Sequence, residues 1–161
     1  MAICLGSMET VALRPAAPDS EATLFALFAA VRSEELAMAG WDAPLRDMVL
    51  RQQFDAQRRG YRAQYPAAAT SLIMLQDDPV GWTILDRSGS PWHCLDIAVV
   101  SGARRRGIAT QVIRTWQDEA TRAHCRIALS VLRTNAAACA LYAALGFRVS
   151  GETETHWHML W

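Results

Sequence analysis

The sequence predicts an α/β domain built on a mixed β-sheet, and three observations support that prediction. The chain has 161 residues, the size of one compact domain. Hydrophobic residues make up 52% of it, enough for a real core. Strand-like and helix-like hydrophobic spacings alternate in the order β-α-α-β-β-β-α-β-α-β. We therefore expect a single domain over residues 1–161, with helices flanking the sheet.

The first half of the chain supplies the strand and helix pair that open this order, followed by a hairpin. Pro15 stops the first strand, and an Asp-Asp-Pro turn at residues 77–79 joins the two strands of the hairpin. In order, we expect a strand at residues 11–14, a helix from about residue 20, a helix from 44 to about 61, and strands at 71–75 and 80–85.

The second half alternates strands and helices. A Ser-Gly-Ser-Pro turn precedes its first strand, and Gly146 ends its last helix. In order, we expect a strand at residues 92–100, a helix from 108, a strand at 127–132, a helix at 135–145, and one or two strands within 147–161.

Charge and hydropathy exclude several classes of protein. All 16 basic residues are Arg and they balance 16 acidic residues, whereas a nucleic-acid binder is normally basic. The apolar runs are too short to span a membrane. The start of the chain lacks the pattern of a signal peptide. We expect a cytoplasmic protein that binds neither nucleic acid nor membrane, with residues 1–8 as a disordered extension.

The cysteines and histidines do not predict a metal site. Four cysteines are widely spread without a C-x-x-C pair, which favours reduced thiols. His156 and His158 alternate on one predicted strand and therefore share a face, but the sequence shows no third ligand. We interpret this pair as cross-strand packing.

One segment carries chemistry on physical grounds: the loop at residues 104–110, between a strand and a helix. The first N–H groups of a helix have no partner within it, and the helix dipole attracts anions to that end. Gly107 and Ala109 are small enough for close approach to the backbone, and three arginines add positive charge. This combination is typical of a diphosphate site, and a solvated arginine loop is the alternative.

Residues 96–110, DIAVVSGARRRGIAT, resemble the acyl-CoA-binding motif of the GCN5-related N-acetyltransferase (GNAT) superfamily. The motif's Arg, Gly and Ala fall on Arg104, Gly107 and Ala109. A second family element follows at Asn135, Ala140-Leu141-Tyr142 and Leu145-Gly146-Phe147, and residues 12–15 are similar to the family's first strand. The matches extend from about residue 11 to residue 160.

Two positions depart from the family pattern. Ser101 stands where members often have Pro, and Arg105 stands where they often have Gly. A residue with a side chain at 105 either restricts the loop to negative φ or strains it. The backbone N–H groups of the loop remain hydrogen-bond donors whether φ at residue 105 is negative or strained, so we expect anion binding to persist.

The resemblance implies a GNAT-like mixed sheet of about six to seven strands with about four helices, in which the parallel fourth and fifth strands splay apart. It implies that acetyl-CoA binds in the gap as the acyl donor, without a metal. The residues it places at the cofactor are Ile97, Ala98, Val99, Arg104, Arg105, Arg106, Gly107, Ile108, Ala109, Thr110, Asn135 and Tyr142.

The resemblance also implies direct attack of a primary amine on the thioester, with the N–H of Val99 stabilising the oxyanion. Tyr142 matches the family's general acid, which protonates the leaving thiolate; a purely binding role is the alternative. His93 and Asp96 are the candidate bases, and a water wire is the third option. A strict alternation puts His93 on the face of Ile97 and Val99, and Asp96 on the opposite face unless a bulge intervenes.

The acceptor remains open at this stage. A small-molecule amine and a peptide both fit as acceptors. A homodimer is also compatible with the sequence. The alternative functions from other classes are a non-catalytic acyl-CoA sensor and an RNA-binding module. In this family the helical segment before the hairpin covers the acceptor site, where the candidate contacts are Trp41, Gln53, Arg58, Arg59 and Tyr61. For the two arginines, a solvated helix face is the favoured interpretation.

Overall fold

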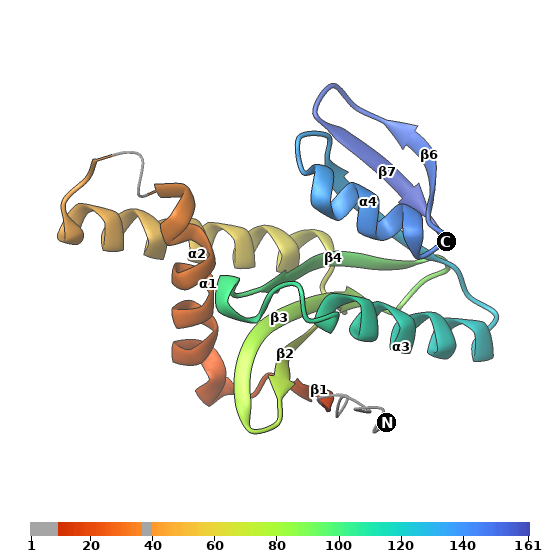
Figure 1. The fold of residues 1–161 in the computed structure, drawn as a ribbon, viewed down its shortest axis with the longest axis horizontal. Coiled ribbons are helices and arrows are strands. Elements are labelled where there is room, and N and C mark those ends of the chain that lie inside the picture. Colours follow the sequence, from red (N-terminus) through yellow and green to blue (C-terminus); the bar gives the residue numbers. More distant parts are fainter. Residues whose placement is uncertain (1–9, 37–39) are drawn as a thin grey trace, which may run out of the picture.

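The computed structural model describes residues 10–36 and 40–161 and contains one seven-stranded sheet in the order β1-β2-β3-β4-β5-β7-β6 (Figure 1). The expected extension at residues 1–8 lies outside this range. The strands are β1 Val11–Pro15, β2 Ala69–Leu75, β3 Asp78–Asp86, β4 Trp92–Val99, β5 Ile127–Leu132, β6 Arg148–Glu152 and β7 His156–Leu160. The α-helices are α1 Glu21–Leu36, α2 Ala43–Gln64, α3 Ile108–Arg122 and α4 Ala136–Ala144. The expected mixed α/β fold is confirmed.

Strands β4 and β5 form the parallel pair of the sheet, as expected, and the other neighbouring strands pair antiparallel. Helix α3 connects the two parallel strands, which is the crossover that a parallel pair requires. Their pairing covers three positions only, from Trp92 opposite Ile127 to Cys94 opposite Leu129. Beyond these positions the register ends, so the sheet opens between the later residues of β4 and β5.

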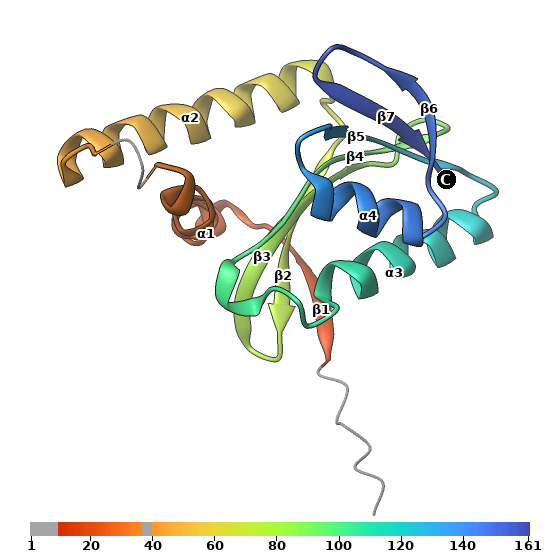
Figure 2. The same ribbon diagram turned by 45° about the horizontal axis from the view of Figure 1, so that its top comes forward.

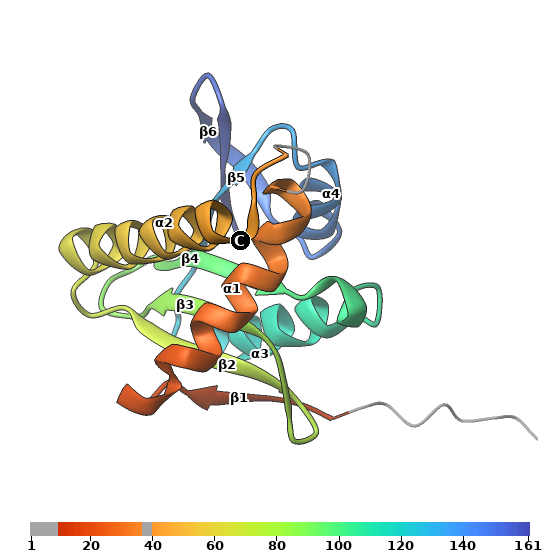
Figure 3. The same ribbon diagram turned by 90° about the vertical axis from the view of Figure 1, so that its left-hand side faces the viewer.

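The helices divide between the two faces of the sheet (Figures 2 and 3). On one face α3 and α4 cover a core that includes Ile113, Trp116 and Tyr142. On the other face α1 and α2 cover a second core that includes Phe28, Phe54 and Trp82. The opening between β4 and β5 therefore has α3 and α4 on one side and α2 on the other.

A β-bulge interrupts β4 where the opening starts. Ile84 of β3 pairs with Asp96, and the next residue, Leu85, pairs with Cys94, so Leu95 is an extra residue in β4. Cys94 packs into the core under α3 and Leu95 into the core under α1 and α2. The extra residue thus places Asp96 on the same side as Leu95, toward α1 and α2.

The hairpin turn differs from expectation, and the number of strands in the last segment is now fixed. The hairpin turn is tighter than residues 77–79: β2 ends at Leu75 and β3 begins at Asp78, because Gln76 adopts a left-handed φ of 56°. The last segment forms two strands, β6 and β7, as one of the two sequence alternatives stated. Among the described residues, no helix is long and apolar enough to cross a membrane.

Candidate active site

The loop between β4 and α3 forms a small hollow at the start of the helix. Gly107 is the residue before α3 and has a φ of 75°, a conformation that glycine adopts without strain. The hollow, about 220 Å³, is lined by the loop, the first turn of α3, Val99 of β4 and Leu141 of α4. The free N–H groups of the first turn of α3 lie beside three exposed arginines, Arg104, Arg105 and Arg106, so the residues present fit a diphosphate.

Arg105 adopts the strained form that the sequence left open. Its φ is 61°, in the left-handed region that favours glycine, where family members often have Gly. Residues in this region help to turn backbone N–H groups inward around an anion. The loop therefore keeps its turned shape at a conformational cost carried by one residue.

Arg104 folds back along β4. Its Nε donates a hydrogen bond to the carbonyl oxygen of Val99, 2.9 Å away. Val99 is one of the β4 residues that the resemblance to the GNAT family places at the cofactor. A ligand amide that used this carbonyl would take the place of the Arg104 side chain.

The other expected cofactor residues divide into backbone and side-chain contributors. Ile97 and Val99 turn their side chains into the core under α3, and Ile108 is buried there, so the groups they offer a ligand are peptide groups. The Asn135 side chain caps α4 by accepting from the N–H of Ala138 at 3.1 Å. Its amide nitrogen is then the group left for a ligand.

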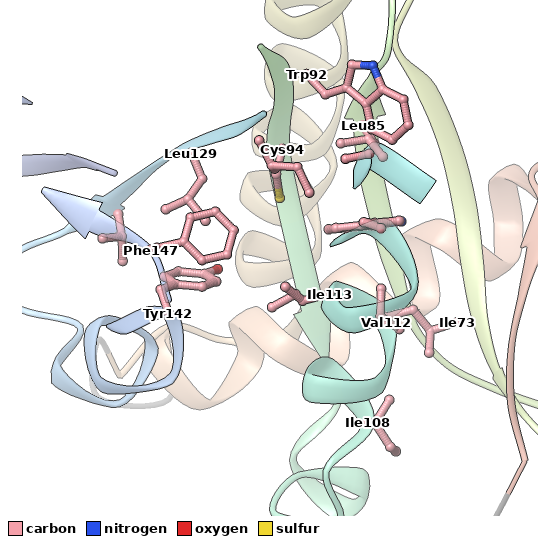
Figure 4. Packing of buried hydrophobic residues seen from close by; sticks show 14 of the residues in the cluster. Ile73, Leu85, Trp92, Cys94, Ile108, Val112, Ile113, Leu129, Tyr142 and Phe147 are labelled. Atoms are coloured by element: carbon pink, nitrogen blue, oxygen red, sulfur yellow. The ribbon is translucent and has the colours of Figure 1, made fainter. Parts of the chain in front are cut away.

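Tyr142 lies at the opening of the sheet. It comes from α4, is 8% exposed, and its ring packs on Phe147 at 5.8 Å between centroids. Figure 4 shows the hydroxyl pointing from α4 toward β4, where the Cys94 thiol also faces the opening. Burial is the main reason that the pKa of Tyr142 is raised. The phenol therefore stays protonated at neutral pH.

Asp96 stands on the opposite side of the sheet, one residue after the bulge. Its Oδ2 accepts a hydrogen bond from the indole N–H of Trp82 at 2.9 Å. Burial raises the pKa of the Asp96 carboxyl, while the Trp82 hydrogen bond and the charge of Arg32 oppose the shift. The residue as a whole is half-buried, and desolvation of its carboxyl is the largest of these effects.

His93 does not share the face of Ile97 and Val99, so the sequence-based placement is wrong. The extra residue Leu95 shifts the alternation of the strand by one. The His93 ring contacts Tyr65, the residue that follows α2, with 5.6 Å between ring centroids. The two candidate bases, His93 and Asp96, therefore face α1 and α2 together.

Tyr61 of α2 fixes the bulge. Its hydroxyl donates to the carbonyl oxygen of Leu95 at 3.0 Å. Burial, with a contribution from the charge of Asp96, raises the pKa of Tyr61 to about 12. A larger hollow, about 600 Å³, lies behind Tyr61 and Tyr65 and is lined by α1, α2 and strands β1 to β3. Neither β4 nor β5 lines it, so it does not reach the opening.

A hollow of about 550 Å³ lies on the α2 side of the opening. It is bounded by the C-terminal end of α2, by β4 and β5 where they separate, and by the β6–β7 hairpin. His93 lines it together with His156 and His158. The described residues nevertheless contain no group of three His, Cys, Asp or Glu side chains that could hold a metal ion.

Comparison with known proteins assigns the architecture. The family model described as "Acetyltransferase (GNAT) family" matches residues 33–147, well over half of the chain. The chain belongs to the GNAT acetyltransferase family. No curated protein matches it significantly.

Solved structures share the GNAT fold at low sequence identity. The PaiA N-acetyltransferase of Thermoplasma acidophilum, in complex with coenzyme A, has a TM-score of 0.70 at 13% identity, over 94% of this chain and 98% of its own. An acetyltransferase of Thermus thermophilus gives 0.67 at 21% identity, over 94% and 96%. The ribosomal-protein-S18-alanine N-acetyltransferase of Escherichia coli gives 0.64 at 15%, over 94% and 91%. At these identities the likeness concerns the fold.

Two neighbours of the candidate bases were missed from the sequence. Tyr65 follows Tyr61 by one helical turn, a spacing that places both rings on one face of α2, and this signal was available. Trp82 carries no such sequence signal, because its hydrogen bond to Asp96 depends on the register of β3 with β4 and on the bulge. Of the other α2 candidates, Arg58 forms an ion pair with Glu21 at 3.0 Å.

Proposed function

We propose that this protein transfers an acetyl group from acetyl-CoA to a primary amine by direct attack, with acceptor and donor meeting at the opening between β4 and β5. The observation that carries the proposal is the pair of hollows. One lies at the start of α3 and suits a diphosphate, and the other lies across the sheet and suits an acceptor. The acyl donor supplies a thioester carbonyl for attack and a thiolate leaving group.

Tyr142 protonates the leaving thiolate in this proposal. A thiol has a pKa of about 8.5, and an ordinary phenol about 10. Burial keeps the Tyr142 phenol protonated over the working pH range, so it stays available as a donor. Its hydroxyl points toward β4 at the opening, which supports this role over simple packing (Figure 4).

Asp96 takes the proton from the acceptor amine. An alkylammonium has a pKa of about 10.4, so a base must collect its proton near neutral pH. Asp96 is next to the bulge, half-buried, and has a raised pKa, which makes its carboxylate a better proton acceptor than an ordinary one. His93 lies two residues before the bulge, nearer the start of β4. We assign it to binding of the acceptor in the hollow on the α2 side.

A covalent acyl-enzyme on Cys94 is disfavoured by the environment of its thiol. Burial raises the pKa of Cys94 to about 12, so the thiolate that such an intermediate needs is scarce at neutral pH. This supports direct transfer.

The test is a thiol-release assay with acetyl-CoA against a panel of amines, peptides and aminoacyl-tRNA. Release of thiol that depends on one acceptor, with acetylated product confirmed by mass spectrometry, is the expected result. Tight binding of acetyl-CoA without turnover on the whole panel would support the non-catalytic sensor instead.

A further inference from the structure

Three of the four histidines of the chain line the hollow on the α2 side of the opening. His93 comes from β4, whereas His156 and His158 come from β7 and are separated from it by β5. The fourth, His124, lies in the turn between α3 and β5 and is exposed. Residues far apart in the sequence thus bring three imidazoles to one cavity.

The other polar side chains that line this hollow are neutral: Tyr61, Gln64, Tyr65, Ser130 and Ser150. No carboxylate side chain of the described residues lines it. An imidazole donates through one N–H when neutral and through two when protonated, and its ordinary pKa is about 6.5. Imidazole N–H groups without a neighbouring carboxylate suit an anionic group, whereas a polycation meets no opposite charge in this lining.

The two ends of the hollow differ. Leu95 lies at the opening, where the thioester must be reached, and His93 lies beside it, where β4 and β5 are still paired. His156 and His158 lie on the hairpin side, facing α2 across the cavity. The Nδ1 of His156 is 2.8 Å from the hydroxyl oxygen of Thr155, so its Nε2 is the ring atom left for a ligand.

We propose that the acceptor is an amine that also carries an acidic group, a carboxylate or a phosphate. The acidic group binds at His156 and His158, and the amine points to the opening beside Asp96. This inference rests on the proposed function for the role of the hollow, but its binding test does not need turnover. Polyamines and other polycationic acceptors are excluded by the same lining.

The experiment uses matched amines that differ in the acidic group. Phosphoethanolamine is compared with ethanolamine, β-alanine with propylamine, and spermidine serves as the polycation. Each is titrated by calorimetry into the full chain saturated with coenzyme A. We expect the acid-bearing member of at least one pair to bind about tenfold or more tightly than its partner, and the pair that shows this identifies carboxylate or phosphate.

The four imidazoles provide a second readout that is independent of catalysis. In an NMR spectrum of the histidine rings, the acid-bearing amine should change the chemical shifts of His156 and His158 and leave those of His124 unchanged. The double variant His156→Gln and His158→Gln should lose the preference for the acidic group while keeping its affinity for coenzyme A. The matched control is His124→Asn, because asparagine tolerates the φ of 52° found there.

Equal binding within both pairs, tighter binding of spermidine, or shifts at His124 as large as those at His156 would overturn the inference. Histidine shifts with an acid-bearing amine in a protein that never transfers acetyl would keep the inference and reject the proposed function. Acetyl transfer only to amines without an acidic group, with no histidine shifts, would do the reverse.

Discussion

The two sides of the opening between β4 and β5 present different chemical groups to a ligand: backbone N–H groups on one side and side chains on the other. On the α3 side, the site consists of backbone N–H groups from one continuous loop, residues 104–110, at the start of a helix. On the α2 side, it consists of side chains from α2, β4, β5 and the β6–β7 hairpin. A backbone site recognises what all acyl-CoA donors share, whereas a side-chain site can change its acceptor by substitution. Substitutions on the two sides should therefore affect different kinetic constants.

The largest effect is expected on the backbone side, from Gly107→Glu. The change forces a residue with a side chain into a left-handed φ and puts a carboxylate where we propose that the diphosphate binds. Loss of two charge-assisted hydrogen bonds predicts coenzyme A affinity lower by about 10³-fold. Calorimetric titration measures it, and unchanged affinity would remove this loop from the site.

Two controls separate strain from charge at this position. Gly107→Ala introduces the same φ strain without a carboxylate, and should lower stability by about 1 kcal/mol while largely keeping the affinity. Gly60→Glu makes the same charge change on the exposed surface of α2, where a β-carbon meets no neighbour within 4 Å. It should leave coenzyme A binding intact.

Tyr142→Phe should act on turnover rather than on binding. The change removes only the hydroxyl, and loss of general-acid help lowers kcat by about 10²-fold or more. The KM for acetyl-CoA should stay within about twofold, because the ring keeps its contact with Phe147. Steady-state kinetics at saturating cofactor decide the matter, and a raised KM with normal kcat would make Tyr142 a binding residue.

Asp96→Asn should lower kcat on the side-chain side of the opening. The asparagine keeps an oxygen for the Trp82 indole but cannot accept a proton, so we expect a loss of about 10²-fold. His93→Gln should instead change the KM for the acceptor. If His93→Gln lowers kcat as much as Asp96→Asn does, the base has been assigned to the wrong residue.

The same variant makes a pH prediction for stability. Because the pKa of Asp96 is raised, the folded state binds more protons than the unfolded state above the ordinary carboxyl range. The stability of the wild type therefore falls, relative to Asp96→Asn, as pH rises from about 4 toward 7. Asp86 is the matched opposite, since hydrogen bonds from Ser88 lower its pKa.

Asp86→Asn should consequently destabilise the protein at pH 7, by an amount that shrinks as pH falls through the depressed pKa of Asp86. Urea unfolding tests the two signs, between about pH 4 and 7 for Asp96→Asn and from about pH 5 downward through the ordinary carboxyl range for Asp86→Asn. Slopes of the same sign would contradict the burial assigned to Asp96.

The smallest effect concerns the loop itself. Arg105→Gly removes the strain of a left-handed φ, which costs about 1–2 kcal/mol of folding stability. Glycine also makes the unfolded chain more flexible, which costs about 0.5–1 kcal/mol of folding stability. We expect the free energy of unfolding to rise by about 0.5–1 kcal/mol, or about 2 °C in melting temperature. Arg106→Gly removes the same charge without relieving a positive φ. It should therefore be neutral or destabilising.

The contrast also explains what could be predicted from the sequence. The loop at residues 104–110 was recognisable because its function is local, and the strand and helix on either side of it were visible from their spacing. The side assignment of His93 failed because the bulge at Leu95 depends on pairing with β3, and a leucine in an apolar run does not indicate it. The three-histidine hollow needed the tertiary fold, since its lining extends from Tyr61 to Met159.

One inserted residue has a consequence for how this strand can change. Side chains in a strand obey a two-residue parity, and Leu95 reverses it midway along β4. If a three-nucleotide deletion removed Leu95, Cys94 and Asp96 would become neighbours on opposite faces, which is the regular alternation of a strand. His93, Cys94 and Asp96 would therefore keep the faces they have now, and only the bulge and the Leu95 carbonyl that Tyr61 binds would be lost. A strand built in this way can gain or lose one residue at this point without sending any other side chain to the opposite face.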